Sequence, residues 1–237
     1  MGDESINKIF AGKITSGVKL QTFQLAIINF VFEQLPNWRD DPDRSDVDSE
    51  PLLNPQLSNF LDCKARDNSP MFHFCHEEPQ AINRTVDMAA KTTENMLIEA
   101  KLYTKYDPVL VFECKRLPAP EIKREKEYVS GKDPNKISGG IQRFKLGHHG
   151  AKHDLAAMIG YVQDESFNHW QDKINEWILE LVKNPIGDSC NWNPTEILNM
   201  AKEDTSIGAV HYLSTHKRNG TVESEIEIHH LWVMMRN

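Results

Sequence analysis

Two acidic side chains and a lysine are spaced so that together they could hydrolyse a phosphodiester. Glu113 and Lys115 stand two residues apart at the polar end of an apolar run, "VLVFECKRL". Because alternate residues of a strand point to the same face, these two side chains are expected to lie side by side. Asp87 comes earlier, near the end of another apolar run. Two carboxylates can hold Mg²⁺ with waters and a substrate phosphate, and a lysine beside them can orient or help deprotonate the attacking water.

This chemistry requires neighbouring strands, and the hydrophobic pattern predicts them. Four runs have the composition and alternation of strands: 71–78, 84–90, 96–103 and 109–117. Asp107-Pro108 predicts a turn before the last run. Residues 86–115 are therefore expected to form successive strands of one sheet, with Asp87 and Glu113 near the ends of adjacent strands at the sheet edge.

Helices and a hairpin are predicted on either side of these strands. Residues 18–35 carry apolar side chains at helical spacing, and Pro36 is expected to end that helix. Residues 167–182 show the same spacing and predict a helix that covers the sheet. A short helix is expected in "GGIQRFKL", followed by a hydrophobic element in "DLAAMIGYVQ". Asn219-Gly220 lies between two β-prone runs and predicts a C-terminal hairpin.

The order Asp, variable spacer, Glu-x-Lys resembles the PD-(D/E)xK nuclease superfamily. The longer pattern "FECKRL", "YVSG", "GGIQRF" and "MIGYVQ" resembles a bacterial group of restriction-endonuclease-like proteins of largely unassigned function. The resemblance covers about residues 70–165. It implies an α/β fold with a restriction-endonuclease-like core, in which a central mixed β-sheet flanked by helices holds the acids on neighbouring strands. It also implies a nuclease that uses Mg²⁺, or Mn²⁺ in its place.

By position, the resemblance assigns roles to individual residues. Asp87, Glu113 and the backbone carbonyl of Cys114 would bind the metal, and Lys115 would position the attacking water. Val86 stands where the family motif has proline. Many members also use an acidic residue from an earlier element, and the candidates here are Glu78, Glu77 and Glu33. The first two are favoured, because a hairpin would return them near Asp87.

Other patterns compete with this site. "IEAK", residues 98–101, is also a Glu-x-Lys, but its strand is less apolar than the central strand of a covered sheet should be. "HHGAKHD", residues 148–154, contains the His-Asp pair of HD phosphohydrolases without their further ligands, and is interpreted as loop histidines near the substrate. "HFCH", residues 73–76, would divide its side chains between two strand faces, which disfavours a zinc site. Cys114 is expected to face the core, because no oriented histidine accompanies it.

A locally basic segment offers contacts to phosphates. Residues 121–153 contain eight Lys or Arg against four acids. The predicted nucleic-acid contacts are Arg116, Arg143, Lys145 and Gln163. The lysines between 123 and 136 equally fit an exposed, flexible charged loop.

Composition predicts a folded protein in one domain of 237 residues. Hydrophobic residues make up 39% of the chain, enough for a core, while the formal charge of −8 does not indicate a basic nucleic-acid binder. We divide the chain into a helix and acidic loop (1–69), the nuclease-like core (70–165), and a covering helix and hairpin (166–237). Six acids make 39–50 a solvated loop, without the glycine and closing glutamate of a calcium loop.

Cysteine usage and hydropathy bear on the compartment. The four cysteines form no CxxC pair, the N-terminus has no signal segment, and no apolar stretch approaches the ~20 residues of a membrane span. A reduced, cytoplasmic protein without membrane contact is expected. The leading hypothesis is a DNA endonuclease of a bacterial restriction or anti-phage defence system, acting alone, as a homodimer or with a partner subunit. The alternatives are a nuclease-like module that binds nucleic acid or a partner, and a nucleotide phosphohydrolase.

Overall fold

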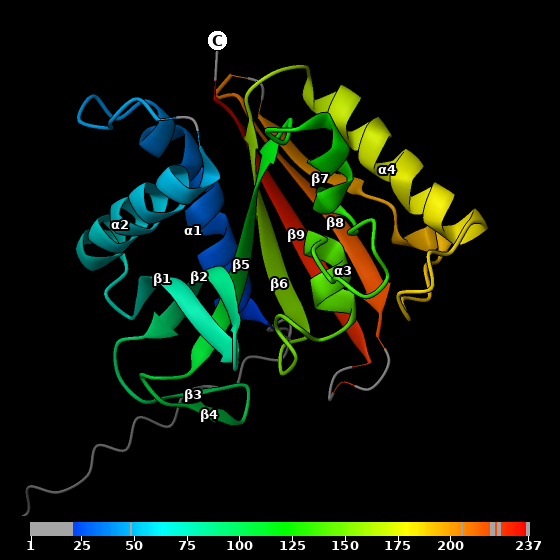
Figure 1. Ribbon diagram of the computed structural model, residues 1–237. Helices are drawn as coiled ribbons and strands as arrows, with labels where there is room; N and C mark the ends of the chain where they lie inside the picture. The colour runs from blue at the N-terminus through cyan, green and yellow to red at the C-terminus, as the bar shows by residue number, and fades with distance from the viewer. Residues whose placement is uncertain (1–20, 48, 205, 219–220, 222–223, 236–237) are drawn as a thin grey trace, which may run out of the picture.

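A seven-stranded mixed sheet forms the centre of the protein (Figure 1). The computed structural model describes residues 21–235 except 48, 205, 219–220 and 222–223. In spatial order the strands are β1 (Phe72–Ala81), β2 (Arg84–Thr92), β5 (Pro108–Leu117), β6 (Leu155–Val162), β9 (Glu225–Met234), β8 (Ala209–Lys217) and β7 (Asn199–Asp204). The pairs β5–β6 and β6–β9 are parallel, and the other pairs are antiparallel. The predicted α/β fold with a central mixed sheet flanked by helices is confirmed.

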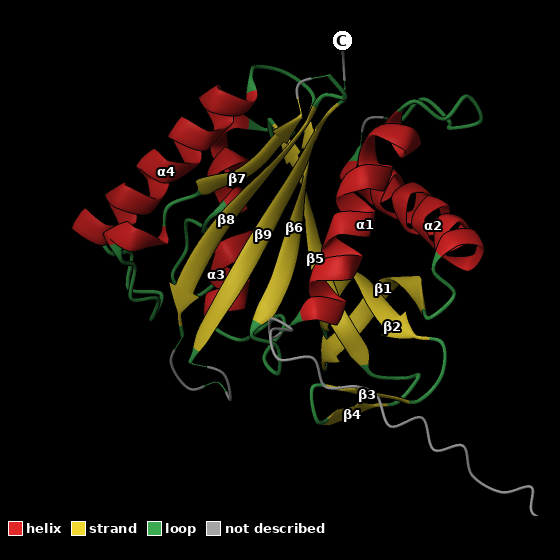
Figure 2. Cartoon of the chain, turned by 180° about the vertical axis from the view of Figure 1, so that it is seen from behind, coloured by secondary structure: helices red, strands yellow, loops and turns green. Residues whose placement is uncertain are grey.

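Helices cover both faces of this sheet (Figures 1 and 2). One face carries α1 (Thr22–Arg39) and α2 (Glu50–Asn68), and the other carries η1 (Ile122–Tyr128), α3 (Gly140–Lys145) and α4 (Phe167–Lys183). A short turn, η2 (Pro194–Glu196), precedes β7. Each face has its own buried core, with Phe32 and Phe112 in one, and Trp170 and Trp232 in the other. The expected covering helix is α4, whose apolar side packs on the second core.

The two central strands are buried on both faces, which explains their uninterrupted apolar sequences. All eight residues of β6 are buried, as are Val109 to Cys114 of β5. Gly160 of β6 has a packing reason of its own. A Cβ at Gly160 would lie 2.3 Å from the ring of Trp232, so only glycine lets that indole pack against the strand.

The N-terminal region contains more helix than the sequence indicates. α1 continues through Pro36 to Arg39, and the amide of Asp40 still donates to the Pro36 carbonyl. Burial of Pro36 and Trp38 favours this extra turn over the loss of one hydrogen bond. The first residues of the predicted helix, 18–20, lie outside the described residues.

A second helix, α2, follows the acidic segment and was not predicted. Ser49 precedes it, Pro51 lies in its first turn, and Leu53, Leu57 and Leu61 recur every fourth residue on its buried side. Its first residue, Glu50, had been assigned to the loop. The acidic connection is therefore shorter than expected, and it ends where a helix begins.

The run at 96–103 is not a strand of the main sheet. It folds into a separate hairpin of β3 (Met96–Ile98) and β4 (Lys101–Tyr103). Glu99 and Ala100 form the turn, with φ angles of 50° and 64°. Alternation alone did not distinguish one eight-residue strand from two short strands and a turn.

The C-terminal hairpin is part of the central sheet. β8 and β9 pair from Ala209↔Val233 to Lys217↔Glu225, and β9 lies parallel to β6. The dipeptide Asn219-Gly220 falls outside the described residues. The edge strand β7 was not predicted, because its residues are largely exposed and polar. In the described parts of the chain, no helix combines the length and apolar composition needed to cross a membrane.

Candidate active site at a fork in the sheet

The strands β2 and β5 diverge inside the sheet and leave a fork between them. Their backbone pairing runs from Lys91↔Pro108 to Met88↔Phe112 and ends there. Beyond that point Asp87 Oδ2 accepts a hydrogen bond of 2.7 Å from the amide of Cys114, in place of a backbone carbonyl. β2 continues along β1, while β5 continues along β6. The fork therefore lies within the sheet, which corrects the expectation of a site at its edge.

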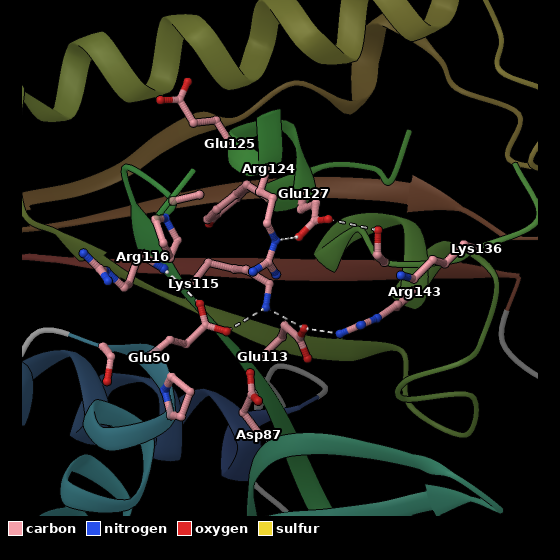
Figure 3. Close-up of a pocket in the computed structure, with 16 residues that line it drawn as sticks. Glu50, Asp87, Glu113, Lys115, Arg116, Arg124, Glu125, Glu127, Lys136 and Arg143 are labelled. Carbon is pink, nitrogen blue, oxygen red and sulfur yellow. Dashed lines mark hydrogen bonds and ion pairs between the residues drawn. The ribbon is translucent and has the colours of Figure 1, made fainter. Parts of the chain in front are cut away.

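A pocket of about 450 Å³ opens at this fork (Figure 3). Asp87, Glu113 and Lys115 all line it. Its other lining residues come from the start of α2, the end of β5, the segment before α3 and α3 itself: Ser49, Glu50, Pro51, Arg116, Ala119, Pro120, Arg124, Glu125, Glu127, Tyr128, Lys136, Ser138 and Arg143. The three residues first selected from the sequence thus share one cavity.

Glu113 is the most enclosed carboxylate of the pocket, with 1% of its surface exposed. Its Oε1 lies 2.6 Å from Arg143 Nη1 and 2.9 Å from Lys115 Nζ, and its Oε2 lies 3.1 Å from His149 Nδ1. Burial alone would raise the pKa of Glu113, but Lys115, His149 and Arg143 hold this pKa well below its usual range. Glu113 is therefore ionised at neutral pH.

Three oxygen atoms surround the side-chain nitrogen of Lys115. Its Nζ lies 2.9 Å from both the Cys114 carbonyl oxygen and Glu113 Oε1, and 3.3 Å from Glu50 Oε1. Burial would lower the pKa of Lys115, but the carboxylates of Glu113, Glu50 and Asp87 raise it above its usual value. Lys115 is therefore an ammonium at neutral pH in this arrangement, which favours orienting the water over deprotonating it.

Asp87 has the opposite electrostatic environment to Glu113. Burial, together with the neighbouring Glu113 carboxylate, raises the pKa of Asp87 to about 7, although Lys115 and the Cys114 amide act against this rise. Asp87 therefore holds a proton more readily than Glu113, because Glu113 has cationic partners whereas Asp87 lies beside a like charge.

Glu50, an acidic residue of an earlier element that sequence reasoning did not select, lines the pocket. Its Oε1 contacts Lys115, and its Oε2 accepts a 3.3 Å hydrogen bond from the Arg116 amide. The three predicted acids lie elsewhere and do not line the pocket: Glu33, Glu77 and Glu78. Glu33 is exposed on α1, and Glu77 is exposed at a positive φ in β1. Glu78 pairs at 2.7 Å with Lys91.

The predicted phosphate contacts divide into two groups. Arg116 and Arg143 line the pocket, and Gln163 supports Arg116 by accepting a 2.8 Å hydrogen bond from its Nε. Gln163 itself is 6% exposed and does not line the pocket. Lys145 is 3% exposed, and its Nζ lies 2.6 Å from Glu196 Oε1. The structure thus places Lys145 in the interior, which corrects its assignment as a nucleic-acid contact.

Replacing Lys145 by alanine is expected to destabilise the fold, because it leaves the buried Glu196 carboxylate without its ammonium partner. Breaking a buried pair in this way typically costs about 3–5 kcal/mol. Urea unfolding followed by tryptophan fluorescence would measure this loss, with Lys105→Ala, an exposed lysine, as the matched control. An unchanged stability accompanied by weaker nucleic-acid binding would contradict the structural role of Lys145.

The competing sequence patterns do not meet at the pocket, with one exception. Glu99 of "IEAK" is exposed in the β3–β4 turn and accepts a hydrogen bond from the Gln21 amide. His153 is buried away from the pocket, and burial lowers its pKa to about 4. The exception is His149, which contacts Glu113. Cys114 faces the α1–α2 core, and burial raises the pKa of its thiol well above the usual value.

The oxygen atoms at the fork suit a hard cation. Among the described residues, no three His, Cys, Asp or Glu side chains are grouped to hold a metal. Mg²⁺ does not need such a group, because it is usually held by one or two carboxylates, with waters and substrate phosphates as its other ligands. The Cys114 carbonyl and Glu113 already surround one positive charge, the Lys115 ammonium, and Asp87 faces the same pocket. This donor set fits a divalent cation.

Comparisons with known proteins give no identification. No protein-family model matches the chain, and neither a curated protein nor a solved structure is significantly similar to it. The functional conclusion therefore depends on the geometry of the pocket and on the sequence resemblance.

Proposed function

We propose that the protein is a Mg²⁺-dependent nuclease with a restriction-endonuclease-like core. The observation that carries this proposal is the convergence of Asp87, Glu113, the Cys114 carbonyl and Lys115 at one fork between neighbouring strands. The PD-(D/E)xK resemblance implies the same arrangement. The resemblance also supports a role as the DNA endonuclease of a bacterial restriction or anti-phage system.

Each residue of the fork has a distinct role in this proposal. Asp87, Glu113 and the Cys114 carbonyl would hold the cation, which when bound stabilises negative charge on the scissile phosphate. Lys115 donates hydrogen bonds as an ammonium, and so orients the attacking water through its oxygen lone pairs. Glu50 holds the Lys115 ammonium in place from the opposite side of the fork.

Besides Lys115, four positive side chains line the same pocket and can bind the phosphates of a polynucleotide: Arg116, Arg124, Lys136 and Arg143. Such contacts fix the register of the backbone without reading its sequence. They favour a polyanionic substrate over an uncharged one, and DNA and RNA share the phosphate backbone that they would contact.

A second candidate is a nuclease-like module that binds nucleic acid and depends on a partner subunit for activity. It is favoured by the ion pairs that Glu113 already makes with Lys115 and Arg143 without a metal. Metal binding distinguishes the two candidates, because only the nuclease requires a divalent cation at the fork.

The proposal is tested by incubating the purified protein with end-labelled DNA and RNA in Mg²⁺, in Mn²⁺ or in EDTA. Cleavage in either metal and none in EDTA is expected. Binding of polynucleotide without cleavage in any metal would favour the partner-dependent module. Hydrolysis of free nucleotides without polynucleotide cleavage would select a phosphohydrolase.

Mg²⁺ binding is expected to weaken as the pH falls below 7. The folded-state pKa of Asp87 is raised to about 7, so below this pH a proton must leave before the carboxylate can bind the cation. The apparent Kd should rise up to about tenfold per pH unit below 7 and level off above it. Titration calorimetry between pH 5.5 and 8.5 would measure this, with Asp87→Asn as the control that lacks the titrating group. A Kd independent of pH would contradict Asp87 as a ligand.

A further inference from the structure

Half of the pocket lining comes from one segment, residues 118–139, which connects β5 to α3 and which we call the wall. It contributes eight lining residues: Ala119, Pro120, Arg124, Glu125, Glu127, Tyr128, Lys136 and Ser138. The wall stands over the fork on the η1 side, opposite the start of α2 (Figure 3). Any substrate must therefore pass between the wall and α2 to reach Glu113.

The wall is anchored firmly to the rest of the fold. Tyr128 is 2% exposed, and its hydroxyl lies 2.8 Å from both Trp232 Nε1 and His230 Nδ1. Two ion pairs attach η1 to α4, Glu125 to Lys173 at 2.7 Å and Lys126 to Glu180 at 2.8 Å. For the lysines between 123 and 136, an exposed, flexible loop is one of two interpretations of the sequence. Lys123, Lys132 and Lys136 are exposed, but these contacts hold η1 against β9 and α4 and make it a fixed side of the pocket.

Near α3, hydrogen bonds hold the two ends of a loop in the wall, residues 131 and 139, close together. Gln142 Oε1 accepts hydrogen bonds from the amides of Gly131 and Gly139, at 3.0 and 3.1 Å. A Cβ at Gly139 would lie 2.2 Å from the Cα of Ser130, so the two ends of this loop can approach only because residue 139 is glycine. The wall therefore does not need to move in order to form the pocket.

A fixed wall restricts the shape of the substrate. The cavity of about 450 Å³ has the size of a small-molecule pocket, and Glu113 at its floor is 1% exposed. In a base-paired duplex each phosphate lies on a convex surface, flanked by neighbouring pairs that would meet the wall before the phosphate reached the floor. A nucleotide that has left the stack fits such a pocket, as it does in enzymes that extrude a nucleotide from the duplex.

The charges of the pocket suit a single backbone that crosses it. Arg116 and Arg143 lie on opposite sides of Glu113, with Glu50 and Lys115 between them (Figure 3). Phosphates before and after the scissile one can therefore each meet an arginine while the scissile phosphate lies over the carboxylates. Single-stranded nucleic acid bends readily enough to follow this path.

On the proposed nuclease function, we infer that the substrate is an unpaired strand, such as a flap, an overhang or a loop, and not intact duplex. Of the two proposed roles, this inference keeps anti-phage defence and sets aside restriction of duplex DNA. The inference depends on the wall, whereas the proposed function depends on the fork. Different experimental results would therefore contradict the inferred substrate and the proposed function.

The test compares one labelled oligonucleotide as a single strand and as the stem of a duplex closed by hairpin loops too short to enter the pocket. In Mg²⁺, cleavage of the single strand should be at least about tenfold faster, because extruding a paired nucleotide has a free-energy cost. Equal rates on strand and stem would overturn the inference and leave the nuclease function intact. Absence of cleavage on both, in Mg²⁺ and in Mn²⁺, would remove the function and the inference together.

A wall variant gives a second, independent readout. Lys126→Ala combined with Lys173→Ala removes both ion pairs to α4, and should raise stem cleavage relative to strand cleavage by loosening the wall. The matched control, Lys64→Ala with Arg66→Ala, also removes two positive charges, but from α2 and from positions that do not line the pocket. The control should keep the wild-type ratio of rates. An unchanged ratio in the folded wall variant would contradict exclusion of duplex by the wall.

Discussion

Replacing Glu113 by glutamine is expected to abolish metal-dependent cleavage, with a loss of about 10³-fold or more in single-turnover rate. The amide keeps the shape of the side chain but removes the negative charge that would hold the cation. Charge stabilisation by a bound metal is worth several kcal/mol, and each 1.4 kcal/mol changes a rate about tenfold. Mg²⁺ binding, measured by calorimetry, should be lost in the same variant.

Glu99→Gln is the matched control, because Glu99 belongs to the other Glu-x-Lys of the chain and is exposed in the β3–β4 turn. This variant should cleave at the wild-type rate. Circular dichroism must show that both variants are folded, since the amide removes a carboxylate partner from both Lys115 and Arg143. If Glu99→Gln were inactive and Glu113→Gln active, the site would belong to "IEAK".

Replacing Lys115 by alanine is expected to lower the cleavage rate by about 10²–10⁴-fold, the range typical of a lost acid–base or water-positioning group. Binding of Mg²⁺ and of DNA should change little, because Asp87 and Glu113 remain. Arginine should not restore the rate. The Lys115 ammonium contacts three oxygens from three residues, and a planar guanidinium does not reproduce that compact arrangement.

The pH profile separates orientation of the water from its deprotonation. The raised pKa of Lys115 keeps it charged throughout the working range, so no lysine titration should shape the wild-type rate between pH 7 and 9. Equal single-turnover rates for wild type and Lys115→Ala, both folded and bound to DNA, would reduce Lys115 to the ion-pair partner of Glu113.

The strands that carry Asp87 and Glu113 could be predicted because local patterns determine them. The apolar run of β5 indicates a strand covered on both faces, and alternation places Glu113 and Lys115 on one side. The fork between β2 and β5 could not be predicted in this way. It depends on where two strands stop pairing, and the spacing of residues within a single segment does not indicate where that pairing ends.

Glu50 was missed because its contact with Lys115 spans 65 positions of sequence. The start of α2 was nevertheless recognisable. Ser49 and Pro51 mark a helix N-terminus, and the leucines that follow recur every fourth residue. The run of acids before Glu50 favoured a loop and concealed this boundary.

Arg143 and Lys145 show why residue type alone did not identify the phosphate contacts. Residues two apart on a helix point in different directions, so only one of this pair could face the fork. The structure directs Arg143 to Glu113 and Lys145 to the buried Glu196.

Several residues of the longer pattern have packing roles that their chemistry does not reveal. In "GGIQRF", Gly139 lets the wall close and Gln142 ties its two ends, while in "MIGYVQ" the glycine makes room for Trp232. Such positions maintain the shape of the pocket. Only a three-dimensional structure separates them from the residues that line it.

One divalent cation is expected to bind between Asp87, Glu113 and the Cys114 carbonyl. Anomalous diffraction from crystals of the protein grown with Mn²⁺ tests it most directly, with crystals grown in EDTA as the control. The expected result is a single strong manganese peak at the fork, within coordination distance of those three groups. Crystals in manganese that show no peak there, with Lys115 and Arg143 still paired to Glu113, would contradict it.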